Sequence, residues 1–197
     1  MWQRTAGAVV LGLLFGATAT LLNVPAGDLV LDASPRRVAS LVVNSGAAWA
    51  GAAVLGGWLG GSVLRGLVAG PVVLVAAVVT YYLLGAAVGS ENADGSPESI
   101  VLYGSVSVVT GTVLGVVGGL IRRRGVLGLV AALVVPMGIF AEQLWRSSIV
   151  GLPPDPAHPA AAVILLGSAL GGAAAAVARF LRQQRSPPVS VVSADEG

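Results

Sequence analysis

The 197-residue sequence contains no cysteine and no lysine, and it has a single histidine. Without cysteine, the chain cannot form disulfides, thiolate nucleophiles or iron–sulfur ligands. One histidine cannot build a histidine metal cluster, and the sequence has neither a Walker phosphate loop nor a helical zinc-protease motif. Charged residues form only 10% of the chain, against about a quarter in a typical soluble domain. We therefore expect no cofactor, no metal and no ordinary soluble enzyme.

The residues that are present are mostly apolar. Hydrophobic residues make up 55% of the chain, a further 28 residues are glycine, and the mean hydropathy is +0.87. This composition excludes a disordered chain and indicates an integral membrane protein in contact with the lipid bilayer. The net charge is +2, but the 11 basic residues are scattered among apolar runs without interleaved aromatics. We therefore expect no nucleic acid partner.

Six continuous apolar runs are each long enough to cross about 30 Å of hydrocarbon as a helix. Barrel strands would be about half as long and would alternate polar with apolar residues. The sequence therefore predicts an all-α polytopic transmembrane bundle of six helices in a single domain over residues 1–182, with a disordered tail over 183–197. The expected spans are 5–24, 38–64, 67–88, 100–121, 126–145 and 160–181.

The arginines orient this expected bundle. Three of the 11, Arg36, Arg37 and Arg146, fall on one side of a six-span arrangement, and the remaining eight fall on the other. Because basic residues concentrate on the cytoplasmic side, we expect both termini to be cytoplasmic in the plasma membrane. The eight arginines are Arg4, Arg65, Arg122, Arg123, Arg124, Arg179, Arg182 and Arg185.

Two features leave alternatives open. Residues 1–19 also suit a cleaved signal peptide, although the apolar run continues to Val24 and favours an uncleaved span. The run 38–64 is too long for a straight crossing and is interrupted by Asn44-Ser45-Gly46. We expect this span to be tilted, kinked or broken there.

Glycines recur four residues apart in several spans, which allows helix backbones to approach closely in lipid. One interpretation is packing within the chain. The other is that one row, with Gly12 and Gly16 the first choice, faces a membrane partner subunit or a second copy in a homo-oligomer. The candidate partner-helix contacts are Gly12, Gly16, Gly111, Gly115 and Gly119.

Most intramembrane polar and aromatic residues fall in the outer half of the expected arrangement, above an inner half of small and aliphatic residues. Polar groups in lipid are costly and often mark a functional site. Large amphipathic side chains above small ones would leave an outward-opening pocket for a small molecule. The candidate ligand-binding residues are Asn44, Ser45, Trp49, Tyr81, Tyr103, Ser107 and Glu142.

Each candidate also has a structural alternative. Ser45 and Trp49 share a helix face, and Asn44 joins them only if the helix is distorted. The rings also suit an interfacial aromatic belt, and the hydroxyls also suit a hydrogen bond to their own backbone. Glu142 also suits an ion pair with Arg146, four residues later.

Three segments carry a family resemblance: GLLFGATATLLN, LVVNSGAAWAGAAVLGGWLGG and VVTYYLLG. They resemble an uncharacterised group of six-span actinobacterial membrane proteins of unknown function, over nearly the whole chain. The architecture is more weakly similar to the substrate-binding subunits of energy-coupling-factor transporters. That similarity implies an outward pocket and a partner-binding surface of small residues on the first span.

The leading hypothesis is a small-molecule binding or transport-accessory subunit with an outward-facing pocket. The second is a structural or interaction protein that acts through its glycine-rich helix faces. The third is an intramembrane enzyme acting on a lipid-like substrate, which the shortage of catalytic residues disfavours.

Overall fold

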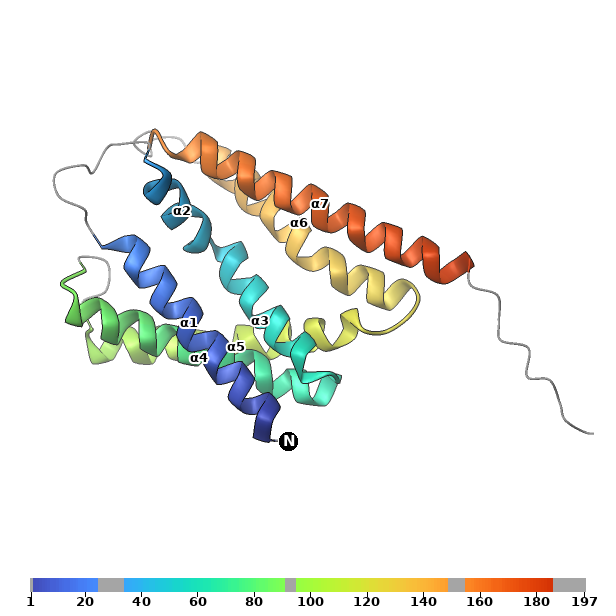
Figure 1. The fold of residues 1–197 in the computed structure, drawn as a ribbon, viewed down its shortest axis with the longest axis horizontal. Helices are drawn as coiled ribbons and strands as arrows, with labels where there is room; N and C mark the ends of the chain where they lie inside the picture. Colours follow the sequence, from blue (N-terminus) through green and yellow to red (C-terminus); the bar gives the residue numbers. More distant parts are fainter. Residues whose placement is uncertain (1, 25–33, 91–94, 149–154, 186–197) are drawn as a thin grey trace, which may run out of the picture.

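The structure is a computed structural model that describes residues 2–24, 34–90, 95–148 and 155–185. All regular secondary structure in these residues is helical, as the sequence predicts (Figure 1). The predicted loops and tail within 25–33, 91–94, 149–154 and 186–197 lie outside the described residues. The helices are α1 (Trp2–Asn23), α2 (Pro35–Val43), α3 (Gly46–Gly60), α4 (Val63–Ala87), α5 (Pro97–Ile121), α6 (Val126–Ser148) and α7 (His158–Arg185).

The prediction of a multi-pass membrane protein is confirmed. Helices α1, α4, α5, α6 and α7 are each long and apolar enough to cross a membrane, and α2 with α3 makes a sixth, bent candidate. Helix α7 continues to Arg185, so residues 183–185 are helical and the expected tail begins too early.

The expected second span divides into two helices that meet at an angle of 56°. Helix α2 ends where the backbone N–H of Asn44 donates to the carbonyl oxygen of Ser40 (2.9 Å). Helix α3 begins directly afterwards, where the Ser45 hydroxyl accepts from the N–H of Ala48 (3.2 Å). Such hydroxyl caps are typical of a helix start. Of the three alternatives for this span, the broken helix is therefore the one observed.

The predicted end of this span at residue 64 is wrong. Gly61 adopts a φ of +81°, a left-handed conformation that closes α3, and Ser62 caps the start of α4 through the N–H of Arg65 (3.4 Å). Residues 63 and 64 therefore belong to α4.

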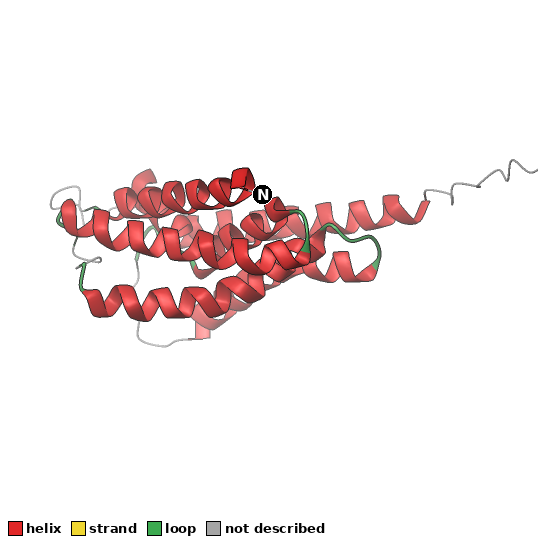
Figure 2. Cartoon of the chain, turned by 90° about the horizontal axis from the view of Figure 1, so that it is seen from below, coloured by secondary structure: helices red, strands yellow, loops and turns green. Residues whose placement is uncertain are grey.

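Helix α4 lies at the centre of a tightly packed group. It contacts α1, α3 and α5, while α6 and α7 form a hairpin that contacts the rest through α2, α3 and α5 (Figure 1). Helices α1, α2 and α3 run obliquely to the longest axis (Figure 1), and the view turned by 90° shows the helices layered one above another (Figure 2).

The glycine rows lie inside this group. A Cβ on Gly70 would clash with the backbone oxygen of Gly111, and a Cβ on Gly115 would clash with that of Gly66. The close contact of α4 with α5 therefore depends on residues without side chains.

The other candidate partner contacts are also internal. Gly12 and Gly16 lie against the α4 backbone, and a Cβ on Gly119 would lie 2.8 Å from the Cα of Val63. The five candidate glycines thus contact helices of their own chain, which agrees with the interpretation that they serve packing within the chain. The structure leaves no room for a partner helix at Gly12 and Gly16, because α4 occupies that face.

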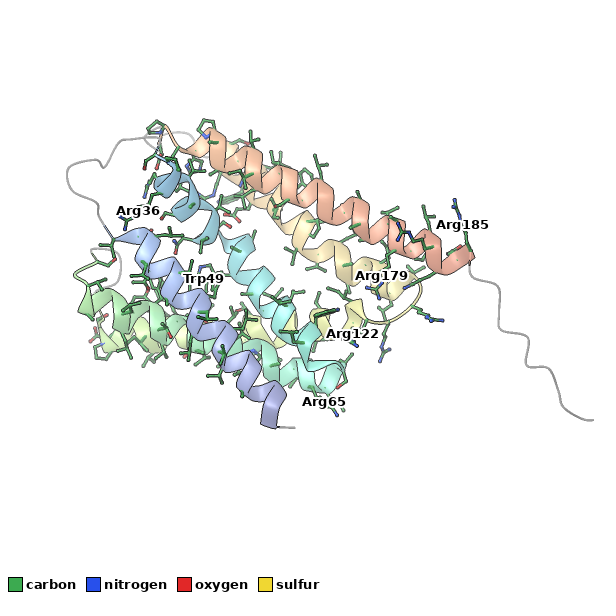
Figure 3. The ribbon with its side chains drawn as sticks, viewed as in Figure 1. Arg36, Trp49, Arg65, Arg122, Arg179 and Arg185 are labelled. Atoms are coloured by element: carbon green, nitrogen blue, oxygen red, sulfur yellow. The ribbon has the colours of Figure 1, made fainter. Side chains whose placement is uncertain are left out.

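The arginines separate along the bundle. Arg65, Arg122, Arg179 and Arg185 gather toward one end, and Arg36 lies toward the other (Figure 3). We call the first the arginine end; it contains the ends of α3, α5 and α7 and the starts of α4 and α6.

Candidate functional site

A cavity of about 560 Å³ lies among α1 to α5, in the half of the bundle away from the arginine end. Its volume is within the range of small-molecule sites. The lining mixes aromatic rings, aliphatic side chains and a few polar groups. The lining residues are Asn23, Arg37, Asn44, Trp49, Leu74, Val78, Tyr81, Tyr82, Tyr103, Val106, Ser107 and Thr110.

A chain of aromatic rings crosses four helices beside this cavity. Phe15 of α1 meets Trp49 of α3 edge-on at 5.2 Å between ring centroids, and Trp49 meets Tyr81 of α4 at 6.0 Å. Tyr81 contacts Tyr82 at 5.4 Å, and Tyr82 stacks on Tyr103 of α5 at 5.8 Å. Such ring pairs contribute about 0.5–1.5 kcal/mol each beyond their buried area. The rings therefore hold the cavity wall in a defined shape.

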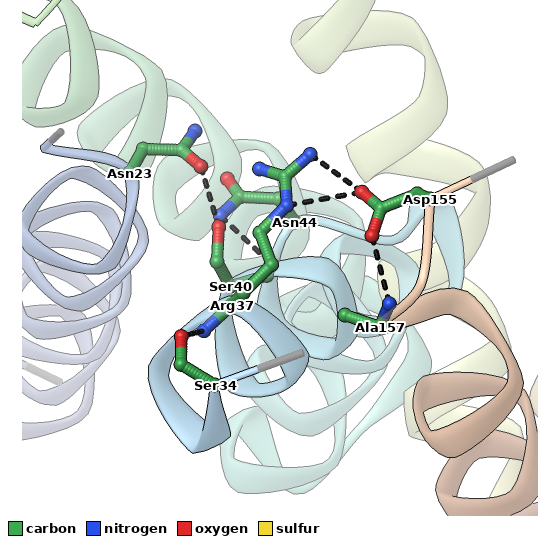
Figure 4. A network of polar contacts seen from close by, with 7 residues as sticks. All are labelled: Asn23, Ser34, Arg37, Ser40, Asn44, Asp155 and Ala157. Atoms are coloured by element: carbon green, nitrogen blue, oxygen red, sulfur yellow. Dashed lines mark hydrogen bonds and ion pairs between the residues drawn. The ribbon is translucent and has the colours of Figure 1, made fainter. Parts of the chain in front are cut away.

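A hydrogen-bonded chain positions the Tyr81 ring. The Ser40 hydroxyl donates to Asn23 Oδ1 (2.6 Å), as Figure 4 shows, and Asn23 Nδ2 donates to the Tyr81 hydroxyl (2.7 Å). The Thr20 hydroxyl donates to the backbone oxygen of Tyr81 (3.0 Å). These bonds connect α1, α2 and α4 around one end of the cavity.

Ser107 differs from the other hydroxyl residues of α5. The hydroxyls of Ser105, Thr110 and Thr112 each donate to the backbone oxygen four residues earlier, at 2.7 Å. Ser107 is only 6% exposed and lines the cavity, and its hydroxyl has no hydrogen-bond partner among the described residues. Since the cavity beside it is open, this hydroxyl is available to donate a hydrogen bond to a molecule bound there.

Asn44 and Tyr103 add further polar groups. Asn44 Nδ2 donates to the backbone oxygens of Ser40 (3.1 Å) and Ala19 (3.3 Å), while its Oδ1 accepts from no described residue. The Tyr103 hydroxyl likewise has no partner in the described part of the chain. The cavity therefore contains acceptors and donors that the bundle itself leaves unused.

An ion pair closes one side of the lining. The Arg37 guanidinium donates twice to Asp155 Oδ2, through Nε (3.0 Å) and Nη2 (2.8 Å), and Asp155 Oδ1 accepts from the N–H of Ala157 (2.9 Å; Figure 4). Burial alone would raise the pKa of Asp155, but these hydrogen bonds and the charges of Arg37 and His158 outweigh it and hold the pKa below its ordinary value. This pair ties α2 to the start of α7.

Five predicted site residues, Asn44, Trp49, Tyr81, Tyr103 and Ser107, lie together in this lining. The other two do not line the cavity.

Ser45 is one of these two. It is 2% exposed, and its hydroxyl donates to the backbone oxygen of Val42 (2.8 Å) while it caps α3.

Glu142, the other residue, caps the same helix start from α6. Its Oε2 accepts from the N–H of Ala47 (3.2 Å), and its Oε1 accepts twice from Arg146 (3.2 and 3.1 Å). An acid is favourable at a helix N-terminus. Both residues therefore serve the break between α2 and α3.

Sequence reasoning missed several lining residues. Asn23 and Tyr82 lie at the same level of their spans as the chosen candidates, and Thr110 follows Tyr103 and Ser107 on one helix face. Those signals could have identified them. The contribution of Arg37 depends on the bend of α2, which the sequence pattern leaves open.

The fold and the cavity define a multi-pass helical membrane protein with an internal recess. The chain matches a family of unknown function, DUF6518, over residues 1–194, and it belongs to that family. The expectation of an uncharacterised family is thereby confirmed. No curated protein and no solved structure matches the chain.

Proposed function

We propose that this protein binds a small molecule in the cavity and serves as a binding or transport-accessory subunit of the plasma membrane. Basic residues favour the cytoplasmic side, and the concentration at the arginine end supports an orientation with both termini inside. The cavity would then lie in the outer half of the membrane and receive its ligand from outside.

The lining limits the class of ligand. Four of the twelve described lining residues carry aromatic rings, one of the twelve is Arg37, and none of them is acidic. Aromatic faces suit flat or ring-bearing groups, and the Arg37 charge is already paired with Asp155. The proposed ligand is therefore a neutral molecule with a flat apolar part.

The observation that carries the proposal is the Ser107 hydroxyl, which lines the cavity beside the rings and has no hydrogen-bond partner among the described residues. The test is native mass spectrometry of full-length protein purified from its own membranes, with Ser107→Ala compared with Ser105→Ala. Ser105 is a matched control because it lies on the same helix, is exposed, and bonds its own backbone.

We expect a co-purified molecule in the wild type and in Ser105→Ala, and at least fivefold less of it in Ser107→Ala, since one hydrogen bond contributes about 1 kcal/mol. Equal retention by the two variants would remove Ser107 from the site. Absence of any molecule from the wild type would count against the binding function itself.

A second candidate function is an interaction protein, which one observation favours. On α7, Gly167 and Gly171 have nothing within 4 Å of the place where a Cβ would lie, unlike the internal glycines. Such an open small-residue face suits another membrane helix. Because the chain has no cysteine, Ala174→Cys would report self-association through oxidative cross-linking in native membranes. Monomer alone after oxidation would exclude self-association through this face.

A further inference from the structure

A separate groove lies between α6 and α7 at the arginine end, far along the bundle from the aromatic cavity. It consists of a cavity of about 230 Å³ between the two helices and an adjoining cavity of about 370 Å³ whose described lining residues all belong to α7. The two cavities share Ala175, Arg179 and Gln183 in their linings. We call this feature the α6–α7 groove.

The groove is apolar at one end and basic at the other. Its inner part is lined by Leu129, Ala132 and Gly172, and its outer part by Arg123, Arg179 and Arg182. Residues 172–183 of α7 extend along it for about 16 Å at the rise of an α-helix. Apolar and charged surface therefore follow one another along the direction that crosses the membrane.

Of the three arginines that line the groove, Arg123 and Arg179 form no ion pair with another described residue. The ion pairs found among the described residues involve Arg37 and Arg146, and both lie at the opposite end of the bundle. Arg122, next in sequence to Arg123, is instead held over the Trp58 ring, with its guanidinium carbon 5.5 Å from the ring centroid. Two adjacent arginines thus differ in their surroundings: Arg122 contacts a ring, and Arg123, which has no ion pair with another described residue, lines the groove.

The groove is supported by a contact between its two walls. Gly125 has a φ of +85°, which turns the chain from α5 into α6 and favours glycine. Its N–H is 3.4 Å from Gln183 Oε1 on α7. This contact fixes the loop that carries Arg123 beside the last turns of α7.

We propose that the α6–α7 groove binds one anionic phospholipid, with its phosphate at Arg123 and Arg179 and an acyl chain along Gly172 and Ala132. Guanidinium groups bind phosphate through paired charge-assisted hydrogen bonds. Small residues leave space for a chain, and basic pockets between transmembrane helices meet anionic headgroups at the cytoplasmic leaflet. Charge complementarity selects this occupant over a zwitterionic lipid.

The test uses full-length delipidated protein titrated with phosphatidylglycerol or phosphatidylcholine and read by native mass spectrometry. The variant Arg123→Gln with Arg179→Gln is compared with Arg124→Gln with Arg185→Gln. Both doubles remove two positive charges from the arginine end, but neither Arg124 nor Arg185 lines the groove. All four positions are exposed, so the variants keep the internal contacts of the bundle.

We expect one phosphatidylglycerol per chain, bound at least tenfold tighter than phosphatidylcholine. The groove double should bind it about 25-fold more weakly, since each arginine contributes about fivefold. The control double should stay within about threefold of the wild type. Ala175→Trp, which fills the groove at unchanged charge, should also reduce binding at least tenfold.

Three outcomes would overturn the proposal. Equal losses in the two double variants would leave only a general surface charge effect. Equal affinity for the two lipids would remove the anionic preference. Displacement of phosphatidylglycerol by millimolar glycerol 3-phosphate would assign the site to a soluble phosphate instead of a lipid.

Discussion

Helices α4 and α5 are in backbone contact at one end and separated by a cavity at the other. Toward the arginine end, Gly66 and Gly70 of α4 meet Gly111 and Gly115 of α5 without intervening side chains. About 18 Å further along α4, the stacked rings of Tyr82 and Tyr103 separate the same two helices.

This difference explains why the bundle has a recess. Two helices that touch through glycine at one end and through large rings at the other are further apart at the ring end. The space between them cannot be filled by the remaining side chains, so a cavity stays open on the ring side. The close contact and the recess are therefore two consequences of one size gradient along α4 and α5.

The largest predicted effect on stability comes from the end where α4 and α5 touch through glycine. Gly70→Leu would push a side chain into the backbone of Gly111 and Gly115, and we expect a loss of at least about 3 kcal/mol in unfolding free energy. The measurement is unfolding in mixed detergent micelles. The control is Gly104→Leu, also in a helix, where the added side chain meets open space and should change stability by under about 0.5 kcal/mol.

A smaller effect on stability is expected at the end where the rings lie beside the cavity. Trp49→Ala removes the edge-on contacts with Phe15 and Tyr81, and we expect a loss of about 2 kcal/mol. Trp145→Ala is the matched control, because Trp145 is 70% exposed and has no ring contact in the described chain. If both variants unfold at the same denaturant concentration, the ring chain does not stabilise the wall.

The hydrogen bond at Tyr81 should contribute less. Tyr81→Phe leaves Asn23 Nδ2 without its acceptor, and bonds between membrane helices contribute about 0.6–1 kcal/mol. Thermal unfolding of Tyr103→Phe serves as the comparison, since its hydroxyl has no described partner and should be nearly neutral. A larger loss for Tyr103→Phe would contradict the assigned network.

The smallest effect concerns pH and the Arg37–Asp155 pair. Because the pKa of Asp155 is lowered by folding, its ionised form stabilises the folded state fully above its unfolded pKa of about 3.9. That stabilisation is lost as the pH falls through the lower pKa of the folded state. It should stay below about 1 kcal/mol, since the Arg37 side chain is 43% exposed.

Stability curves of the wild type and Asp155→Asn from pH 7 to pH 2.5 test this. The difference between the two proteins should be constant above about pH 5 and should shrink below pH 4. A difference that grows on acidification would reverse the sign and exclude the pair as its cause.

The helices were predictable because lipid imposes a length on each apolar run. The sequence also placed the interruption at Asn44-Ser45-Gly46, although it left three alternatives open. The end of the second span was missed because residues 63 and 64 are as apolar as the span before them. Only the left-handed turn at Gly61 separates α3 from α4.

The site residues were predictable where their depth in the membrane is enough to bring them together. Trp49, Tyr81 and Tyr103 belong to different spans at one level, and in the structure they line one cavity. Glu142 was chosen for the same reason, yet it faces a helix start that exists only because the preceding span breaks. Arg37 was not predicted to line the cavity, because its pairing with Asp155, 118 residues away, follows from the tertiary fold.

The break before α3 has a mechanical consequence. Only Asn44 and Ser45 connect α2 to α3, so these two residues are the point about which the short helix α2 could rotate. Its far end is fastened by Arg36 to the carbonyl of Leu21 and by Arg37 to Asp155. Moving α2 away from the bundle would require breaking these two contacts and the Ser40–Asn23 hydrogen bond, while α3 could stay intact. Because Arg37 and Asn44 line the cavity, such a movement would also displace part of the cavity wall.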